Sequence, residues 1–414
     1  MIKIKRVRAL EILDSRGKPT IKAFLEMVGH PTIYSASVPS GASTGEHEAI
    51  EFRDGDKKRY GGNGCLKAVT LINEELNQQI SGTEFESQKQ FDDLLCALDG
   101  TKNKSKLGGN SMLALSVVFS KGFAGVKGLP LFSHFADIVG NKTPTLPQLT
   151  INLFSGGKHA GLQTPVQDIL LVPNAATVQK ALAMTYHVYY QAAKNLNQSK
   201  KMRLLRADEG GLSPECDTVE ELFEYALKAI EDCGYVSGKD ISLAIDVAAS
   251  HFYENGSYHF YNTKLSGLEM IEKLVKWQSD YALVSIEDGL DENDWKHWPI
   301  LVKKVNSRCD IMGDDLLCTN ISLIEKAQKE SAATALLLKM NQIGTVTEAL
   351  EAFTLAKSKN WRVTASARSG ETEDNWLADL AYGISADYIK IGSITQSERL
   401  AKYNRLLEIE NHIY

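Results

Sequence analysis

The chain has 414 residues, more than one ordinary domain requires, so its length predicts two structural units. Apolar residues make up 43% and charged residues 24%, which indicates a globular protein and excludes a disordered one. The net charge of −6 argues against a nucleic-acid partner, because proteins that bind nucleic acids carry a basic stripe.

Cysteine usage and the absence of long apolar runs predict a cytoplasmic location. The six cysteines are scattered, without a C-x-x-C pair, as expected for free thiols in a reducing compartment. No run approaches the ~18 apolar residues of a membrane span. The basic N-terminal segment is interrupted by Glu11, Asp14 and Arg16, so it does not read as a secretory signal.

The first third of the chain predicts an α+β unit. Residues 1–60 are rich in strand patterns, whereas residues 65–97 and 109–127 show helical periodicity. A Pro- and Thr-containing stretch at 140–148 is typical of a linker. We therefore expect an N-terminal domain at 1–139 and a second domain at 140–414.

Six short apolar runs in the second domain each lead to a charged residue. Runs of four to six apolar residues between turn residues predict buried strands. The spacings between the successive charges are 41, 27, 25, 29 and 22 residues, which fit one strand, one helix and two short loops. The charges are Asp246, Glu287, Asp314, Lys339, Arg368 and Lys390.

Charged residues at the C-terminal ends of buried strands are typical of a β/α barrel, whose active site lies at that face. Three acids and three bases would then meet at one mouth. This combination predicts a metal site beside an anion site.

The motifs of the chain resemble those of the enolases, the phosphopyruvate hydratases of glycolysis. The resemblance covers nearly the whole chain, and its motifs follow the family's order. They include DSRGKPT at 14–20, VPSGASTGEHEA at 38–49, GGKHA at 156–160, ADEGGLSP at 207–214, LAIDVAASHFY at 243–253, VSIEDGLDENDW at 284–295, LLKMNQIG at 337–344 and SARSGETED at 366–374.

The resemblance implies an α/β fold: a modified (β/α)8 TIM barrel that opens ββαα, with an N-terminal α+β capping domain. It also implies a homodimer or a ring of dimers. The implied activity is the Mg²⁺-dependent dehydration of 2-phospho-D-glycerate to phosphoenolpyruvate, by loss of the C2 proton and the C3 hydroxyl.

The resemblance implies two Mg²⁺ ions, one held tightly and one that arrives with the substrate. Asp246, Glu287 and Asp314 match the ligands of the first ion, and Ser43, in the loop PSGASTG, matches a ligand of the second. Hard oxygen ligands suit Mg²⁺. The alternatives are three ordinary loop acids and a plain flexible turn.

Lys339 matches the general base of the family, which must be neutral to accept a proton. We expect Lys390, Arg368 and the metals to lower its pKa. The resemblance implies that Lys390 contacts the substrate carboxylate and that Arg368 and Ser369 hold the phosphate. The alternatives are a strand-end lysine with an exposed amine and a surface ion pair.

Glu209 matches the general acid that protonates the departing hydroxyl. We expect neighbouring carboxylates, Asp168 above all, to raise its pKa. His159 and Gln167 match residues that contact the substrate. A lone histidine is more often a capping or surface residue, but the GGKHA context favours substrate contact.

The chain departs from the family pattern at several positions. Asp168 stands where the family has Glu, Ala367 where it has His, Ser155 where it has Asn and Gln396 where it has Arg. Pro165 would stiffen a loop that is usually polar. These changes gather on the side of the C3 hydroxyl and the mobile loop, whereas the metal, base and carboxylate positions are intact.

Three functions therefore remain open. The first is a Mg²⁺-dependent lyase that makes phosphoenolpyruvate. The second is an enolase paralogue that acts on a related phosphorylated or phosphonate acid. The third is a non-catalytic binding or structural paralogue, consistent with the surface display known for the family, although that function predicts loss of the metal ligands and the base.

Overall fold

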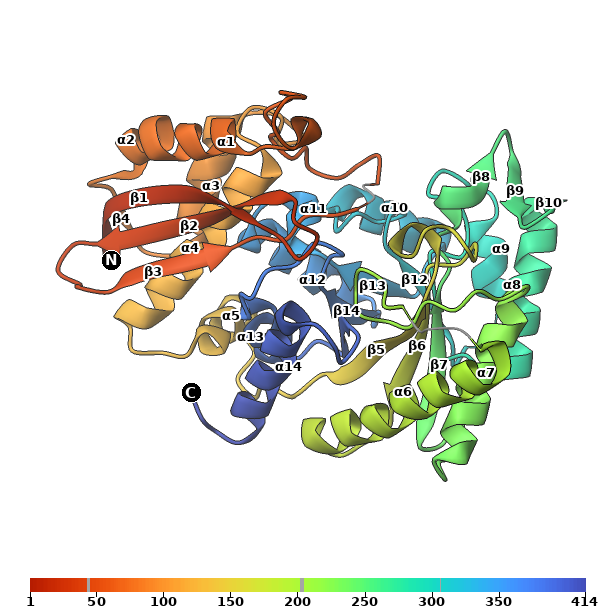
Figure 1. Ribbon diagram of the computed structural model, residues 1–414. Coiled ribbons are helices and arrows are strands. Elements are labelled where there is room, and N and C mark those ends of the chain that lie inside the picture. Colours follow the sequence, from red (N-terminus) through yellow and green to blue (C-terminus); the bar gives the residue numbers. More distant parts are fainter. Residues whose placement is uncertain (43–44, 202–204, 306) are drawn as a thin grey trace.

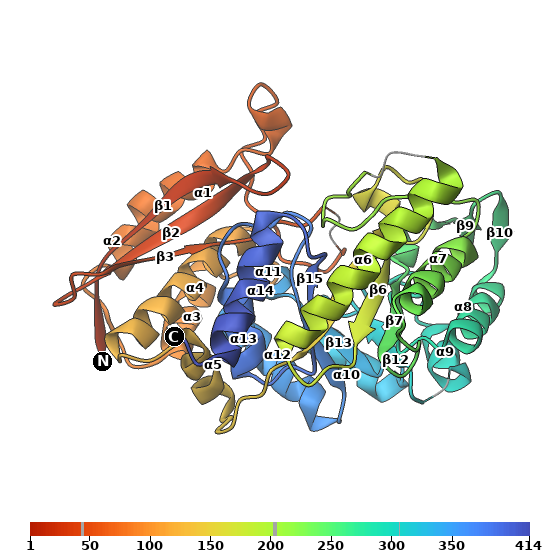
Figure 2. The ribbon, with the colours of Figure 1, turned by 60° about the horizontal axis from the view of Figure 1, so that its bottom comes forward.

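The structure is a computed structural model that describes residues 1–42, 45–201, 205–305 and 307–414. It consists of an N-terminal sheet with its helices and a larger barrel, which lie side by side (Figure 1). Turning the molecule shows the same two parts, with helix α14 (Ser397–Glu410) close to the junction (Figure 2).

The strand-rich start of the chain forms an antiparallel sheet in the order β3-β2-β1-β4. Its strands are β1 (Ile2–Leu13), β2 (Pro19–Met27), β3 (Ile33–Ser37) and β4 (Glu84–Phe85). Buried residues alternate with half-buried ones along β2 from Ile21 to Met27, as expected for a sheet with one face turned to the core.

Helices cover the buried face of this sheet. They are α1 (Leu66–Leu71), a π-helical turn (Ile72–Leu76), α2 (Asn77–Ile80), α3 (Gln88–Asp99) and α4 (Gly109–Val126). Helix α5 (Leu131–Val139) follows and packs against α4 and against α13 (Trp376–Gly383) of the barrel. The predicted helical stretch 65–97 is interrupted after Ile80, where Gly82 adopts a φ of 82° and the chain turns into β4. Phe91 and Phe119 stack with ring centroids 4.2 Å apart and tie α3 to α4.

Within the described part of the chain, eight strands close into a barrel in the order β11-β12-β13-β14-β15-β5-β6-β7. They are β5 (Gln148–Ser155), β6 (Asp168–Pro173), β7 (Ile241–Asp246), β11 (Ser285–Glu287), β12 (Asp310–Gly313), β13 (Ala335–Leu338), β14 (Arg362–Ser366) and β15 (Tyr388–Gly392). The predicted modified TIM barrel is confirmed.

The barrel begins with two strands and two helices before the βα repeats, as the resemblance implied. Strand β6 runs antiparallel to both β5 and β7, and α6 (Val178–Lys200) and α7 (Val219–Asp232) follow it. Because β6 is reversed, its first residue, Asp168, pairs with Asp246, the last residue of β7.

The remaining barrel helices follow their strands and close the outer layer. They are α8 (Gly267–Tyr281), α9 (Trp298–Lys304), α10 (Ile321–Glu330), α11 (Met340–Ile343), α12 (Val346–Ser358), α13 (Trp376–Gly383) and α14. A small ribbon of β8 (Tyr253–Glu254), β9 (Ser257–Phe260) and β10 (Thr263–Leu265) precedes α8. Ser266 and Glu269 form a capping box that sets the start of α8.

Polar contacts join the N-terminal domain to the barrel. Asp92 of α3 accepts hydrogen bonds from the backbone and the hydroxyl of Thr347, at the start of α12. Lys121 of α4 forms an ion pair with Asp374 at 2.7 Å. Ser40 and Gly370 exchange two backbone hydrogen bonds, which hold the segment at Ser40 against the barrel.

Among the described residues, no single helix is long and apolar enough to cross a membrane. One bent pair, α4 with α5, meets the criteria of length and composition only when the two helices are taken together.

Candidate active site

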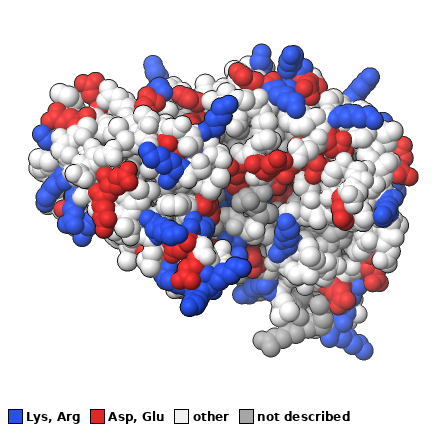
Figure 3. Space-filling model, turned by 90° about the horizontal axis from the view of Figure 1, so that it is seen from above, with Lys and Arg blue, Asp and Glu red and all other residues white. Residues whose placement is uncertain are grey.

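A polar cavity of about 30 Å³ opens at the end of the barrel where the parallel strands finish. Acidic side chains gather near the centre of the face seen from above (Figure 3). The sequence-predicted residues that line the cavity are His159, Gln167, Glu209, Asp314, Lys339, Arg368, Ser369 and Lys390. Eight side chains from widely separated segments of the chain thus meet in one place.

Asp246 and Glu287 lie beneath this cavity at the ends of β7 and β11, and Lys390 joins them. The Lys390 amine donates to Asp246 Oδ2 at 2.7 Å and to both Glu287 oxygens at 2.7 and 2.8 Å. Burial opposes its positive charge, but the two carboxylates hold the pKa of Lys390 well above its usual value. Burial and the neighbouring Asp246 raise the pKa of Glu287, so this trio is a compact set of coupled charges.

Lys390 does not end its strand, as the sequence pattern suggested, but lies inside β15, which continues to Gly392. Its long side chain still brings the amine to the ends of β7 and β11. A second cavity of about 20 Å³ lies on the other side of Glu287 and Lys390 and is lined mainly by apolar residues of the barrel interior. The charged groups therefore form the floor of the mouth.

Lys339, which follows β13, contacts Asp314, which follows β12. The Lys339 amine donates to Asp314 Oδ2, and Gln342 Nε2 donates to Asp314 Oδ1 at 2.8 Å. The expectation of a lowered pKa for Lys339 counted the metals together with Lys390 and Arg368, and the protein groups alone raise this pKa. Burial, Arg368 and Lys390 do disfavour its charge, but Asp314, with Glu287, outweighs them and raises the pKa.

The Arg368 guanidinium lies at the same mouth, where it is 5% exposed. It pairs with both oxygens of Glu48, with Nη1 at 3.0 Å from Oε2 and Nη2 at 3.1 Å from Oε1. The Ser369 hydroxyl accepts a hydrogen bond from Arg16 Nη1 at 3.0 Å. The two residues predicted to hold an anion are therefore each in contact with the N-terminal domain.

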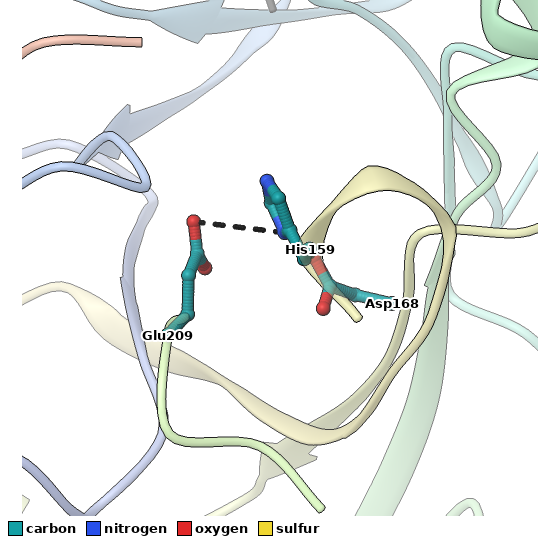
Figure 4. Close-up of side chains that lie close together, drawn as sticks. All are labelled: His159, Asp168 and Glu209. Carbon is teal, nitrogen blue, oxygen red and sulfur yellow. Dashed lines mark ion pairs between the residues drawn. The ribbon is translucent and has the colours of Figure 1, made fainter. Parts of the chain in front are cut away.

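His159, Asp168 and Glu209 form a compact buried group in which the Glu209 carboxylate faces the His159 ring from a separate segment (Figure 4). His159 Nδ1 lies 3.7 Å from Asp168 Oδ2 and 3.9 Å from Glu209 Oε1. The outer oxygens of the carboxylates are fixed, because Asp168 Oδ1 accepts from Ser155 Oγ at 2.6 Å and Glu209 Oε2 accepts from Asn152 Nδ2 at 3.0 Å.

The expected raised pKa of Glu209 is wrong, and the raised pKa belongs to Asp168. Burial favours the neutral form of Glu209, but His159, Arg399 and the two lysines together lower its pKa. Burial raises the pKa of Asp168, and the charge of Glu209 adds to that effect. The same carboxylates outweigh the burial of His159 and raise its pKa. The environment therefore favours protonation of Asp168 and His159 more than that of Glu209.

Gln167 precedes Asp168 and donates from Nε2 to Asp246 Oδ2 at 2.8 Å, which links the two acid clusters. Gly210 follows Glu209 with a φ of 84°, and a Cβ there would lie 2.4 Å from Thr395 Oγ1, so the close backbone approach requires glycine. Ser43, the predicted ligand of a second ion, lies outside the described residues.

Two family models match the chain. One, described as the enolase N-terminal domain, matches residues 4–135, and the other, described as the enolase C-terminal TIM barrel domain, matches residues 143–414. The chain belongs to the enolase family. This membership makes the protein a lyase-type enzyme of the enolase superfamily whose substrate is a small molecule.

The donor set of this enolase fits a divalent cation. Asp246, Glu287 and Asp314 supply only carboxylate oxygens, the ligands that Mg²⁺ prefers, and all three side chains are buried. Buried carboxylates at this density require positive charge nearby, and Lys339 and Lys390 provide it here. Asp314 also lies in a group with Asp288 and Asp315 whose ligand atoms are within 4.8 Å of one another.

Sequence reasoning did not assign several residues that shape this enolase site. Glu48 pairs with Arg368, Gln342 donates to Asp314, and Asn152 holds Glu209. Asp288 accepts from the backbone of Asp314 at 2.8 Å and fixes the start of that loop. Glu48 and Gln342 lie inside motifs that resemble the family, GEHEA and MNQIG, but nothing in the spacing alone identifies their partners.

Proposed function

We propose that this enolase catalyses the Mg²⁺-dependent dehydration of 2-phospho-D-glycerate to phosphoenolpyruvate, as in glycolysis and gluconeogenesis. The observation that supports the proposal is the composition of one cavity. The cavity combines Lys339, which contacts the buried carboxylate of Asp314, with two further cations, Arg368 and Lys390. A separate group of one histidine and two acids lies beside them, formed by His159, Asp168 and Glu209. Removal of a proton and departure of a hydroxyl require a base and an acid of this kind.

Lys339 is the proposed base that takes the C2 proton. It must be neutral to do so, and its ion pair with Asp314 favours the charged form. Arg368 and Lys390 oppose that charge. The pKa of Lys339 therefore falls whenever the Asp314 carboxylate is engaged elsewhere.

Asp246, Glu287 and Asp314 are proposed to hold the tightly bound Mg²⁺, and Ser43 a second ion that arrives with substrate. When bound, Mg²⁺ stabilises the second negative charge that the substrate carboxylate gains as the C2 proton leaves. Lys390 is proposed to contact this carboxylate, because its amine lies on the floor of the cavity. Arg368 and Ser369 are proposed to hold the phosphate at the rim.

Glu209 is proposed to deliver a proton to the C3 hydroxyl, which then leaves as water. Asp168 and His159 supply that proton, since the pKa of each is raised while that of Glu209 is lowered. Gln167 connects this group to Asp246 and positions the two halves of the site. His159 and Gln167 also line the cavity and are proposed to contact the substrate.

A second candidate is an enolase paralogue that acts on a related phosphorylated or phosphonate acid. Ala367 favours it, because this small apolar residue lines the cavity beside Arg368 where the family pattern has a histidine. For either candidate we propose a cytoplasmic homodimer or ring of dimers, with an N-terminal domain at 1–139 and a barrel domain at 140–414. Sedimentation of the purified protein tests the oligomeric state.

The test measures phosphoenolpyruvate absorbance with purified protein, 2-phospho-D-glycerate and Mg²⁺, with and without a chelator. Rapid product formation that the chelator abolishes supports the hydratase. Exchange of the C2 proton into heavy water without product supports the paralogue. Absence of both product and exchange contradicts both and supports the non-catalytic alternative.

A further inference from the structure

We propose that Thr319 is a positioning residue whose single buried hydroxyl fixes both Lys339, the proposed base, and the carboxylate of Asp314, a proposed Mg²⁺ ligand. The proposal rests on the function proposed above, because it presumes the roles of these two residues. Thr319 does not line the cavity, so it acts only through the residues that it holds.

The backbone of Thr319 adopts a left-handed conformation that β-branched residues rarely take. Its φ is 51°, and that of the preceding residue, Cys318, is 44°. The turn closes the segment that starts at Asp314, because the backbone N–H of Cys318 donates to the carbonyl of Asp314 at 2.7 Å. Strained conformations persist only where the surrounding contacts hold them, and they gather at functional sites. The contacts of the Thr319 side chain therefore indicate what this turn achieves.

The Thr319 hydroxyl forms one hydrogen bond in each direction. Its oxygen accepts from the backbone N–H of Lys339 at 3.0 Å, and its proton is donated to Gln342 Oε1 at 2.9 Å. Lys339 directly follows β13, and Gln342 lies on the short helix α11 that begins there. The same hydroxyl thus fixes the point where the lysine leaves its strand and the orientation of the glutamine amide.

The orientation of the Gln342 amide determines which group faces Asp314. Because Oε1 accepts from the Thr319 hydroxyl, Nε2 is turned the other way, where it donates to Asp314 Oδ1 at 2.8 Å and approaches Glu48 Oε1 at 3.4 Å. A reversed amide would place its carbonyl oxygen against both carboxylates. The other oxygen of Asp314 accepts from the Lys339 amine. Thr319 therefore acts on both Asp314 oxygens, on one through Gln342 and on the other through Lys339.

Loss of this hydroxyl should disturb the site more than the loss of an ordinary hydrogen bond. Thr319 and Gln342 are both 0% exposed, so solvent does not readily replace a missing partner. Removal of a group that orients a metal ligand weakens metal binding by about 10- to 100-fold. Displacement of a reacting group by about 1 Å lowers a rate by about 100-fold. A defect in Mg²⁺ binding and a defect in turnover should therefore appear together.

The experiment titrates the full-length, metal-depleted protein with Mg²⁺ by calorimetry. Thr319→Val keeps the branched shape but removes the hydroxyl, and we expect it to weaken Mg²⁺ binding by about 10-fold. Thr319→Ser retains the hydroxyl and should bind Mg²⁺ within about twofold of the parent protein, because the hydrogen bonds remain. Thr185→Val is the matched control, because Thr185 is equally buried and its hydroxyl donates only to the Ala181 carbonyl of α6. This control should bind Mg²⁺ like the parent protein.

Gln342→Met interrupts the same chain of hydrogen bonds with Thr319 intact, so the test remains decisive if Thr319→Val fails to fold. It should weaken Mg²⁺ binding by a similar factor, and the double variant should bind no more weakly than Gln342→Met alone, because both changes break one connection. With 2-phospho-D-glycerate and saturating Mg²⁺, Thr319→Val should lower kcat by about 10-fold and leave KM nearly unchanged, because the base is displaced while the substrate-binding groups stay in place.

Unchanged Mg²⁺ affinity in Thr319→Val and Gln342→Met would overturn the proposal, as would an equal loss in Thr319→Ser and Thr319→Val or additive losses in the double variant. An unchanged kcat in Thr319→Val would overturn the role of the hydroxyl toward Lys339. If the parent protein neither forms phosphoenolpyruvate nor exchanges the C2 proton, the proposed reaction is contradicted. The Mg²⁺ titrations still decide in that case whether Thr319 positions Asp314.

Discussion

The Arg368 guanidinium and the Glu48 carboxylate form a two-point ion pair across the junction between the barrel and the N-terminal domain. Both side chains are buried, and the two hydrogen bonds measure 3.0 and 3.1 Å. Gln342, which also holds Asp314, lies 3.4 Å from Glu48 Oε1. The pair thus connects the N-terminal domain to the Arg368 side of the cavity and, through Gln342, to Asp314.

Replacement of Glu48 by Gln should lower the free energy of unfolding by about 3 kcal/mol, because it leaves the Arg368 charge buried with weaker compensation. Urea unfolding measures the difference. Glu84→Gln, which alters an exposed pair with Lys3, is the matched control and should change stability by less than about 1 kcal/mol. If both substitutions changed the free energy of unfolding by the same small amount, the buried pair of Arg368 and Glu48 would contribute little to stability.

Lys390→Met should destabilise the protein most when divalent cations are absent. The substitution leaves Asp246 and Glu287 buried side by side without the amine that neutralises them. Mg²⁺ should then raise the melting temperature of the variant by more than it raises that of the parent protein. Thermal unfolding with Mg²⁺ and with a chelator measures both shifts, and Lys3→Met is the control. Equal Mg²⁺ shifts in parent and variant would contradict the assignment of these carboxylates to a metal.

Asp92 predicts a pH dependence of stability that is independent of the active site. Burial raises the pKa of Asp92 to about 6 although Ser116, Thr347 and Gln88 all donate to it. In the unfolded chain the group ionises near pH 4, so its contribution to stability is fully present below that pH and is lost as the pH rises to about 6. The loss amounts to about 3 kcal/mol.

The variant Asp92→Asn removes this loss, so its stability relative to the parent protein should increase from pH 4 to pH 6 and then stay constant. Any hydrogen bonds lost with the carboxylate add an offset that does not depend on pH. Asp93→Asn, at the exposed neighbouring position paired with Lys89, is the control. Denaturation curves at several pH values test the slope, and a flat difference across this range would contradict a raised pKa.

Ala367→His should raise kcat for 2-phospho-D-glycerate if this position limits the proposed reaction. Ala367 lines the cavity next to Arg368, so an imidazole there can reach the phosphate and the leaving group. Initial rates measure the effect. Ala367→Gln, with a polar side chain of similar size, is the control, and a gain of the same size in both would assign the effect to bulk rather than to the imidazole ring. Unchanged or lower rates in Ala367→His would contradict the prediction.

The positions of the site residues followed from the sequence better than their electrostatics did. The end of a buried strand is a local property, so the places of Asp246, Glu287 and Lys339 could be predicted from short apolar runs. Lys390 lies within its strand, and only the long side chain brings its amine to the mouth. A pattern of apolar residues predicts that a strand is present, but it does not specify whether a charged residue lies at the end of the strand or inside it.

The pKa shifts could not be predicted, because each depends on the balance of several neighbours from distant segments. The sequence suggests that cations surround Lys339, which is correct, but it does not show that Asp314 lies in direct contact and dominates. Likewise, Asp168 was expected to act on Glu209, whereas His159 and the more distant cations determine the direction. Such a balance follows only from three-dimensional distances.

The pairing of β15 with β5 has a consequence for how the protein acquires its site. Residues near 150 and residues near 390 are neighbours in the ring of strands, so some 240 residues of chain must be in place before the ring can close. Until then, Asp168 at the start of β6 lacks the nearby charge of Lys390. During synthesis on the ribosome, the reactive centre is therefore among the last parts of the molecule to form. An incomplete chain has an open sheet edge, which makes it a natural client for chaperones.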